Sequence, residues 1–289
     1  MAAKTRTGKT IGGQIAFQGD IGSYSYHACG MRFPKLKPLP CTTFEDAINA
    51  VHVGKAQLAM IAVDNSVAGR VADVHHLLPG SGLKIVGEHY QPIHHHLLAV
   101  KGASLKTIKR VESHIHALSQ CRKFIRKHKL KAVVALDTAG AARDIAARND
   151  VSVAAIASAA AGKIYGLTSL AMNIEDEQHN TTRFLIMARE AAAPKPSARC
   201  VTSMIFRLKS VPAALYKALG GFATNGINLT KLESYLIGGF FKKAEFYVEV
   251  EGHPDAPAFK NALRDLALYS DRVNFLGTYP ADKFRFRGR

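Results

Sequence analysis

Residues 14–30 read QIAFQGDIGSYSYHACG, a short apolar run followed by a glycine-containing turn and the start of a helical pattern. The run Gln14–Gln18 favours a β-strand, and similar β-branched runs recur along the first two thirds of the chain with helical patterns between them. This alternation predicts an α/β fold built on largely parallel sheets. The further strands are expected at Leu58–Val63, Leu83–Glu88, His96–Val100, Val133–Leu136 and Ser152–Ile156.

Two helices between these strands carry start and stop signals. Thr43 offers an N-cap, acidic residues follow in the first turn, and Gly54 ends the apolar pattern of Phe44, Ala47, Ile48 and Val51. A second helix is expected over residues 138–148, with Asp137 or Thr138 as its cap. In the first of these helices the apolar residues line one face.

The bulk composition is that of a globular protein with more than one core. The chain has 289 residues, of which 47% are hydrophobic and 21% charged. No apolar run approaches the roughly 18 residues of a membrane helix, and residues 1–10 are basic without the apolar segment of a signal peptide. The four cysteines are widely spaced, which argues against a zinc site and a disulfide framework. We therefore expect a cytoplasmic protein with reduced cysteines at Cys29, Cys41, Cys121 and Cys200.

The net charge of +17 is unusual, and such a field attracts nucleic acid, anionic lipid or small anionic substrates alike. Its densest stretch, residues 122–131 (RKFIRKHKLK), has helical spacing with Phe124 and Ile125 facing inward, as in a solvated helix face. The tail at residues 283–287 (KFRFR) interleaves aromatic and cationic side chains, a pattern on which single strands stack. Nucleic-acid binding would give a steep salt dependence, and we do not expect it as the main function.

A domain boundary is expected at residues 190–198 (EAAAPKPSA), which lack apolar periodicity and contain two prolines. The patterns beyond it follow the order βαββαβ, which is that of the ferredoxin-like split unit. They lie at Cys200–Leu208 (strand), Val211–Asn225 (helix), Asn228–Tyr235 and Glu245–Val250 (strands), Ala256–Leu268 (helix) and Val273–Tyr279 (strand).

Two loops that follow strands could bind an anion. Residues 19–25 (GDIGSYS) follow the first strand and open a helix, whose free N–H groups favour a carboxylate, although any tight strand-to-helix turn would suit the glycines. In residues 64–69 (DNSVAG), the amide of Asn65 and the hydroxyl of Ser66 are both able to hold a carboxylate. An Asx turn followed by a glycine stop explains this second loop equally well.

Residues 180–184 (NTTRF) place polar groups immediately before an apolar strand. A hydroxyl and a guanidinium at the mouth of a strand suit an anionic ligand. In a regular strand Thr182 and Arg183 point to opposite faces, so both line one cleft only if the strand begins irregularly. Thr182 is therefore the better candidate for the site.

The run His94-His95-His96 is typical of metal binding at first sight. In an extended segment neighbouring side chains alternate between faces, so at most two of the three reach one ion. We expect no carboxylate beside them and find no second compact His/Cys group. The sequence therefore predicts no metal site.

Taken in order, these motifs resemble prephenate dehydratase. In the first two thirds the resemblance lies in GDIGSYS (19–25), DNSVAG (64–69), PIHHHLL (92–98), DTAGAA (137–142), YGL (165–167), NIED (173–176) and NTTRF (180–184). After the linker, LYKAL (215–219), INLTKLES (227–234) and VEGH (250–253) resemble the ACT regulatory domain of that family. The combination is far more specific than any single motif.

The resemblance implies two α/β lobes of periplasmic-binding-protein type over residues 12–190 and a ferredoxin-like ACT domain over residues 199–282. It implies a lyase that converts prephenate to phenylpyruvate in phenylalanine biosynthesis, without a cofactor or metal. Thr182 would be the catalytic residue, and the implied substrate-binding residues are Ser23, Asn65, Ser66, Thr138, Asn180, Arg183 and Phe184. Arogenate is the alternative substrate, and a non-catalytic amino-acid sensor is the alternative class.

The C-terminal part of the resemblance implies feedback regulation by phenylalanine and assembly into a homodimer or homotetramer. The implied effector-binding residues are Ala214, Leu215, Asn228, Leu229, Glu233 and Ser234. Two departures bear on the effector: Ala213 stands where the family's Gly-Ala-Leu motif begins, and Tyr235-Leu236 replaces Arg-Pro. Phenylalanine sensing is therefore a weaker expectation than catalysis.

Overall fold

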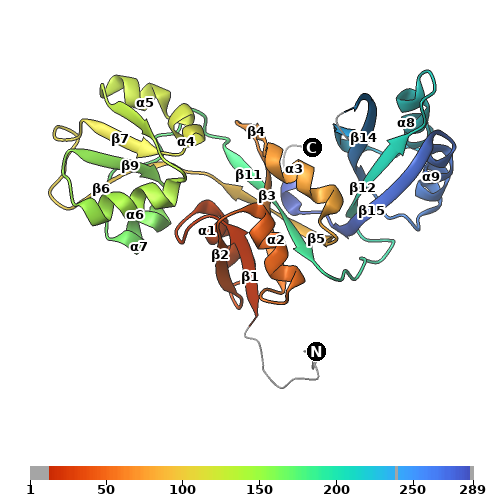
Figure 1. Ribbon diagram of the computed structural model, residues 1–289, viewed down its shortest axis with the longest axis horizontal. Coiled ribbons are helices and arrows are strands. Elements are labelled where there is room, and N and C mark those ends of the chain that lie inside the picture. The colour runs from red at the N-terminus through yellow and green to blue at the C-terminus, as the bar shows by residue number, and fades with distance from the viewer. Residues whose placement is uncertain (1–12, 238–239, 287–289) are drawn as a thin grey trace. The chain divides into compact units, whose positions relative to one another are not determined.

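The computed structural model describes residues 13–237 and 240–286 (Figure 1). Residues 1–12, 238–239 and 287–289, and with them the basic N-terminus and the last tail arginines, lie outside the described part. The chain divides into two compact units, the first of residues 1–71 and 91–184, the second of residues 72–90 and 185–289. Within the described residues, no helix is both long and apolar enough to cross a membrane.

The first sheet follows the expected strand–helix alternation. Its strands run in the order β2-β1-β3-β11-β5, with β4 paired to β3, and β1 lies parallel to both β2 and β3. Strand β2 contains Pro38 and Pro40, which an edge strand tolerates because one side of it needs no partner. Its elements are β1 (Gln14–Gln18), α1 (Tyr24–Arg32), β2 (Lys37–Cys41), α2 (Phe44–His52), β3 (Leu58–Asn65), β4 (Gly69–Arg70), β5 (Lys84–Pro92) and β11 (Thr181–Ala188).

The second sheet lies in the first unit, with the order β10-β6-β9-β7-β8. Strands β7, β8 and β9 are parallel, whereas β6 and β10 run antiparallel to their neighbours. Helices cover both faces of this sheet. Alternate strand residues therefore pack in two separate cores, as Leu97 and Leu98 do. Its elements are β6 (His96–Ala99), β7 (Arg110–Ser113), α4 (Ile115–Gln120), α5 (Arg122–Lys127), β8 (Lys131–Val134), α6 (Thr138–Arg148), β9 (Val153–Ala157), α7 (Ala159–Tyr165) and β10 (Thr168–Ala171).

Two expectations in this sheet are corrected. Strand β8 lies two residues before the expected position, because Lys131–Val134 pair with Arg110–Ser113. Leu136, which was expected to belong to the strand, lies beyond it and is 89% exposed. The basic helix is shorter than its charge pattern, since α5 ends at Lys127. Within α5, Ile125 is buried as expected and Phe124 packs against the core partly exposed.

The capping predictions for the first unit are confirmed. Thr43 and Asp46 form a capping box at the start of α2, and the carboxylate of Asp137 accepts a hydrogen bond from the backbone N–H of Gly140 at the start of α6. Helix α2 ends at His52, and Gly54 follows with a positive φ of 76°. The four cysteines are free thiols.

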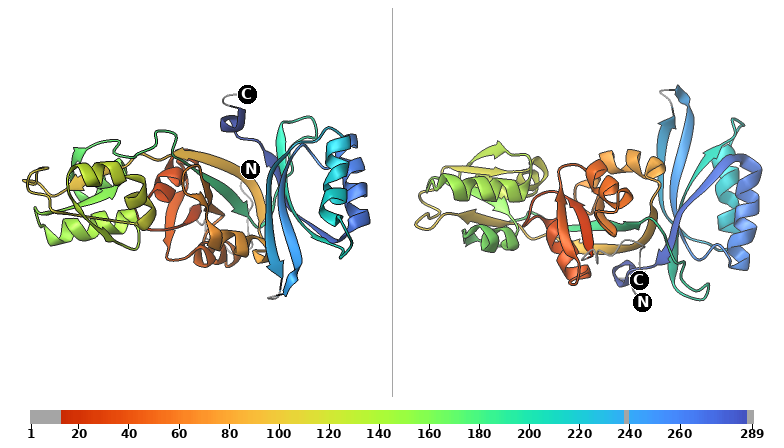
Figure 2. Two further views of the ribbon diagram at one scale, coloured as in Figure 1. Left: turned by 90° about the horizontal axis from the view of Figure 1, so that it is seen from above. Right: turned by 60° about the horizontal axis from the view of Figure 1, so that its bottom comes forward.

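The second unit contains an antiparallel sheet with the order β13-β14-β12-β15. The four strands of this sheet and the helices α8 and α9 follow one another as strand, helix, strand, strand, helix, strand, as the sequence predicts. Figure 2 shows α8 and α9 side by side on one face, where they pack on apolar side chains such as Met204 and Val248. The elements are α3 (Ala72–Leu77), η1 (Leu78–Gly80), β12 (Cys200–Leu208), α8 (Ala214–Thr224), β13 (Leu229–Ile237), β14 (Phe240–Glu251), α9 (Pro257–Tyr269), β15 (Ser270–Pro280) and η2 (Lys283–Phe286).

Candidate active site

The ends of β3 and β11 bring three of the expected site residues together. Asn65 is the last residue of β3, and Thr182 is the second residue of β11. The Asn65 Nδ2 donates to Thr182 Oγ1 at 3.1 Å. Ser66 joins the same two segments, because its backbone N–H donates to Thr181 O at 2.9 Å and its hydroxyl donates to His179 O at 2.7 Å.

Three side-chain amides form a closed ring behind Thr182, which we call the amide ring. Asn65 Nδ2 donates to Asn180 Oδ1 at 2.7 Å, and Asn180 Nδ2 donates to Gln120 Oε1 at 2.9 Å. Gln120 Nε2 closes the ring with a longer bond of 3.3 Å to Asn65 Oδ1. Asn180 is 2% exposed and Gln120 9% exposed, so water cannot replace these partners without cost.

Backbone groups fix the direction of the amide ring. The N–H groups of Val67 and Ala68 donate to Asn65 Oδ1 at 3.0 and 2.7 Å. A backbone N–H is only a donor, so the accepting atom of Asn65 must be its oxygen and the amide nitrogen must face Thr182. The Thr182 oxygen therefore accepts from Asn65, and its own proton remains available to donate to a ligand.

The same reasoning assigns the tautomer of His95. Its Nε2 lies 2.9 Å from Gln120 Oε1, which is an acceptor, so Nε2 carries the proton. The other ring nitrogen, Nδ1, is then an acceptor 3.0 Å from the Tyr24 hydroxyl, whose single proton is shared between Nδ1 and His94 O at 2.7 Å. Burial lowers the pKa of His95 against the opposing effects of Gln120 and Glu175, and burial raises the pKa of Tyr24. The ring of His95 is consequently neutral near pH 7.

A carboxylate does lie beside the three histidines, which corrects the expectation that none would. Glu175 accepts from the His94 ring and from the backbone N–H of His95, both at 2.8 Å. Burial acts to raise the pKa of Glu175, but these bonds outweigh it and the pKa is lowered. The histidine rings do not converge, since His96 bonds Ser169, and no cluster of three metal-ligating side chains occurs in residues 13–237 and 240–286.

Arg183 and Phe184 do not join Thr182 in the amide ring. The Arg183 guanidinium lies 3.4 Å from the carboxylate of Asp64, and its side chain is only 8% exposed. Asp64 is the neighbour of Asn65 in β3, and Arg183 is the neighbour of Thr182 in β11. Neighbouring side chains in a strand point to opposite faces, so the Arg183–Asp64 ion pair lies on the other face from the Asn65–Thr182 bond. Phe184 is 1% exposed and belongs to the core.

The first glycine loop is held closely by the second sheet's helices. Ser23 is the N-cap of α1, where its hydroxyl accepts from Tyr26 N at 3.2 Å. Gly22 has a φ of 92°, and a Cβ there would lie 3.1 Å from the Cα of Ala161. The buried Ser158 hydroxyl donates to Gly22 O at 2.7 Å. The glycine is therefore required both by its conformation and by the close approach of α7.

Thr138 opens α6 directly after its cap, Asp137. A cavity of about 700 Å³ lies beside this helix start, lined by the turn at Gly19 and Asp20, by residues 40–43 and by residues of the segment 135–144. Arg143 of α6 forms an ion pair with Asp20 at its edge. The residues that line this cavity therefore come from segments that follow strands of the first sheet and of the second sheet.

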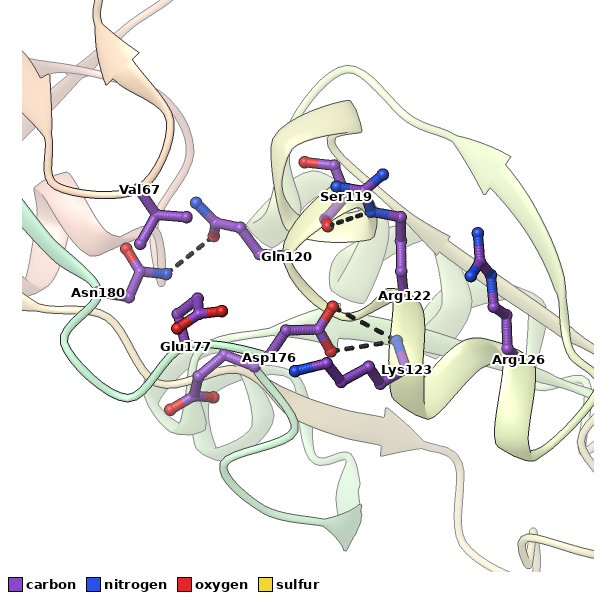
Figure 3. Close-up of a pocket in the computed structure, with 10 residues that line it drawn as sticks. Val67, Ser119, Gln120, Arg122, Lys123, Arg126, Asp176, Glu177 and Asn180 are labelled. Carbon is purple, nitrogen blue, oxygen red and sulfur yellow. Dashed lines mark hydrogen bonds between the residues drawn. The ribbon is translucent and has the colours of Figure 1, made fainter.

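A second cavity, of about 380 Å³, adjoins the amide ring (Figure 3). Gln120 and Asn180 face each other at one end, next to Val67, and the cations of α5 lie at the other. The backbone N–H of Lys123 donates to Asp176, which holds the acidic loop against α5. The lining of this cavity therefore combines the basic groups of Arg122, Lys123 and Arg126 with the carboxylates of Glu175, Asp176 and Glu177.

The expected effector residues lie on two elements of the second unit. Ala214 and Leu215 open α8, and Leu229 begins β13. Asn228 Nδ2 donates to Glu251 Oε2 at 3.3 Å, and Glu233 Oε1 lies 3.7 Å from Lys231 Nζ. Ser234 is exposed on the same strand. Ala213, the N-cap of α8, has a φ of 59°, a region in which glycine is more stable than alanine.

Sequence reasoning missed Gln120, His95 and Tyr24 as parts of the site. Gln120 ends a short helix whose pattern shows only burial, and a lone glutamine carries no motif. Tyr24 was read only as part of the glycine loop, and His95 only as part of a histidine run. Their roles depend on partners 25 and 71 residues away in the chain, which no local pattern records.

Comparison with known proteins agrees with these features. The family model for prephenate dehydratase matches residues 15–192. A bifunctional N-acyl-homoserine lactone acylase/prephenate dehydratase of Komagataeibacter europaeus is 48% identical over 94% of this chain and 97% of its own length. Arogenate dehydratase/prephenate dehydratase 2 of Arabidopsis thaliana is 38% identical over 93% of this chain and 73% of its length. Prephenate dehydratase from Arthrobacter aurescens, solved in complex with L-Phe, has a TM-score of 0.84 and 31% identity over 93% and 90% of the two chains.

A mixed α/β fold with a buried polar site at the ends of two strands is the class that the geometry defines. The chain belongs to the prephenate dehydratase family. The activity of that family is of lyase type.

Proposed function

We propose that this protein is a prephenate dehydratase that converts prephenate to phenylpyruvate. The observation that carries the proposal is the Asn65–Thr182 bond, which leaves the Thr182 proton free to donate from a partly buried position beside the neutral amide ring. The proposal also draws on the family, whose members act on prephenate or arogenate according to their names.

In the proposed reaction the ring carboxylate leaves as carbon dioxide, its bonding electrons enter the ring, and the ring C–O bond breaks. The departing oxygen leaves as water after gaining a proton, and the ring becomes aromatic. Threonine is a weak acid in water, so Thr182 contributes a positioned hydrogen bond to the departing oxygen, with the final proton relayed through it. A neutral ring of amides suits this step because it places no charge beside the leaving carboxylate.

Ser23, Ser66, Thr138, Asn180 and Arg183 are proposed to bind the substrate with the N–H groups after Gly22. The helix starts at Ser23 and Thr138 support the binding of carboxylates, since both offer N–H groups. For Arg183 the ion pair with Asp64 favours a bracing role, and Phe184 would shape the core beneath the site.

We further propose that residues 12–190 form the catalytic domain, with two lobes of periplasmic-binding-protein type, and that residues 199–282 form an ACT domain. The order βαββαβ supports the second assignment. Phenylalanine is proposed as a feedback inhibitor that binds near Ala214, Leu215, Asn228, Leu229, Glu233 and Ser234 in a homodimer or homotetramer. A relative solved with L-Phe bound supports this effector.

A second candidate activity, hydrolysis of the amide of N-acyl-homoserine lactones, is favoured by the name of the relative that is 48% identical. It would require a nucleophile or an activated water at the scissile amide. The hydroxyls of Ser23 and Ser66 are engaged by backbone groups, which leaves Thr182 as the better candidate for such a role.

The test is a comparison of three substrates with one set of variants. Purified wild-type protein, Thr182→Ser and Thr182→Ala are assayed with prephenate, arogenate and an N-acyl-homoserine lactone. We expect phenylpyruvate from prephenate, partial activity in the serine variant, and a loss of 10²–10⁴-fold in a folded alanine variant. A wild-type protein inert on prephenate and arogenate would refute the proposal and favour the sensor or acylase readings.

A further inference from the structure

The C-terminal segment of the chain is fixed to strand β5 by a buried ion-pair cluster, which we call the C-terminal clasp. Arg285, in η2, donates from Nε to Glu88 Oε1 at 2.6 Å and from Nη2 to Glu88 Oε2 at 2.9 Å. The same Nη2 donates to Glu249 Oε2 at 2.7 Å. One guanidinium therefore joins β5 to β14, and all these residues lie in the second unit.

The clasp is buried to a degree unusual for charged groups. The side chains of Glu88, Glu249 and Arg285 are 0%, 1% and 10% exposed. Charges so far from water must be paired, and a planar guanidinium holds two carboxylates in a geometry that an ammonium does not reproduce. The clasp thus fixes the separation and angle between β5 and β14 within a narrow range.

Further contacts attach the same two segments. The backbone N–H of Asp282 donates to Glu88 Oε1 at 3.0 Å, and the Phe284 ring stacks on Tyr90 with centroids 4.6 Å apart. The alternating aromatic and cationic tail, which suggested single-stranded nucleic acid, is occupied within the protein at Phe284 and Arg285. At the other end of β5, Gly277 of β15 approaches the Ile85 backbone so closely that no Cβ would fit.

Arg285 also contacts the strand on which the effector is proposed to bind. Its Nη1 donates to Thr230 Oγ1 at 3.1 Å. Thr230 follows Leu229 and precedes Glu233, two of the proposed effector residues on β13. A shift of β13 on effector binding would therefore act directly on the guanidinium that holds Glu88.

From Glu88 the chain reaches His95, which bonds Gln120 of the amide ring, in seven residues. Strand β5 ends at Pro92, and His95 follows with its bonds to Gln120 and Tyr24. Gln120 in turn donates to the Asn65 oxygen of the amide ring. A displacement of β5 along its length would alter the position of His95, and with it the partner that holds Gln120.

We propose that Arg285 is a positioning residue that couples effector binding on β13 to the amide ring through Glu88 and β5. The proposal rests on the proposed function, because it deepens the regulation by phenylalanine. On effector binding a shift of β13 moves Thr230 and, through their hydrogen bond, Arg285. The clasp then moves β5, and His95 no longer supports Gln120 in the orientation that prepares Thr182. Coupling free energies of this kind correspond to about 5–150-fold changes in affinity.

The experiment measures inhibition and binding separately. Wild type, Arg285→Lys, Arg285→Gln and the exposed control Lys283→Gln are assayed with prephenate with and without saturating phenylalanine. In parallel, the rise of Tm with phenylalanine reports effector binding. We expect the Arg285 variants to keep the phenylalanine-dependent rise of Tm and to lose most of the inhibition, while Lys283→Gln behaves as wild type.

Thr230→Val provides a variant that spares the buried ion pairs and should fold even if the Arg285 variants do not. We expect it to weaken inhibition by several-fold relative to wild type, with kcat in the absence of phenylalanine unchanged. Inhibition equal to wild type in Thr230→Val, or in a folded Arg285 variant, would overturn the coupling role. An active wild type that phenylalanine neither inhibits nor stabilises would instead refute the regulation itself, and the coupling with it.

Discussion

The two units each bury a polar network, and the two networks differ in charge. In the first unit the amide ring of Asn65, Asn180 and Gln120 consists of neutral groups, and each amide donates to the next. In the second unit the clasp of Glu88, Arg285 and Glu249 consists of ions. Asn180, Gln120 and the three clasp residues are largely shielded from water, so the strength of both networks depends on complete pairing.

The difference corresponds to two tasks. A neutral ring sets the direction of hydrogen bonds without adding a negative charge that would repel a carboxylate ligand. It also leaves the hydroxyl proton of Thr182 available to donate. An ionic clasp provides stronger attachment, at the cost of desolvating its charges, and offers no proton to a ligand. We therefore expect changes in the amide ring to alter rate and changes in the clasp to alter stability and regulation.

Asn65→Asp is the change that should most strongly disturb the amide ring. The carboxylate keeps the bonds from Val67 and Ala68 but faces Asn180 and Thr182 with an oxygen, so the Thr182 proton turns toward it and away from the substrate. We expect kcat to fall about 10²–10³-fold. The exposed Asn49→Asp of α2 serves as the matched control, and a kcat near wild type in Asn65→Asp would contradict the assigned direction of the ring.

Glu88→Gln tests the clasp, where we expect a loss of stability and little change in rate. The variant leaves the Arg285 charge short of one buried partner, which costs about 3 kcal/mol of stability. Thermal unfolding should show a clearly lower Tm, with kcat within a few-fold of wild type at a temperature where the protein is folded. The exposed Glu190→Gln is the control. A large loss of kcat at unchanged Tm would reverse the division between the two networks.

The pH dependence of stability tests whether His95 is neutral. Burial lowers its pKa in the folded state, so the unfolded chain binds more protons at acid pH. The neutral ring contributes stability that is complete above about pH 6.5, the unfolded value, and is lost as pH falls toward the folded pKa. In His95→Asn the decrease of Tm between pH 7.5 and 5.5 should be smaller than in wild type. His96 and His114, whose pKa values are also lowered by burial, account for the remainder.

Equal slopes in wild type and His95→Asn would show that His95 is not the buried neutral group. The exposed His52→Asn provides the baseline, because its side chain lies at the end of α2, outside the amide ring.

The smallest effect is expected at Ala213. An alanine with a φ of 59° is strained by about 1–2 kcal/mol, of which glycine recovers part after its larger loss of chain entropy. Ala213→Gly should therefore raise stability by about 0.5–1 kcal/mol. The control is Ala223→Gly inside α8, which should lower stability by about 1 kcal/mol. Their Tm values should move in opposite directions if α8 begins as described.

The sequence predicted most of the elements because their signals are local. The strand at Gln14–Gln18, the capped helix after Thr43 and the order βαββαβ each depend on a few neighbouring residues. Strand β8 was placed two residues late because apolar Leu136 continues the pattern beyond the last paired residue. Pairing is a property of two strands, and one strand's composition does not record it.

The sequence predicted only part of the candidate site, because several of its contacts join residues that are far apart in the chain. Asn65, Asn180 and Thr182 lie in motifs and do come together. Gln120 carries no motif, and the tail pattern that includes Arg285 indicated a nucleic-acid ligand instead. Their roles arise from partners 55 and 197 residues away. The direction of the amide ring depends on two backbone N–H groups, which no pattern of side chains reveals.

The central claim is that the amide ring acts on the reaction through the Thr182 hydroxyl, and a double-mutant cycle tests it most directly. The kcat of wild type, Asn65→Asp, Thr182→Ala and the double variant is measured with prephenate under one set of conditions. If Asn65 acts by directing the Thr182 proton, the double variant should be about as slow as Thr182→Ala alone. Effects that multiply, so that Asn65→Asp costs the same factor with and without the hydroxyl, would contradict the account.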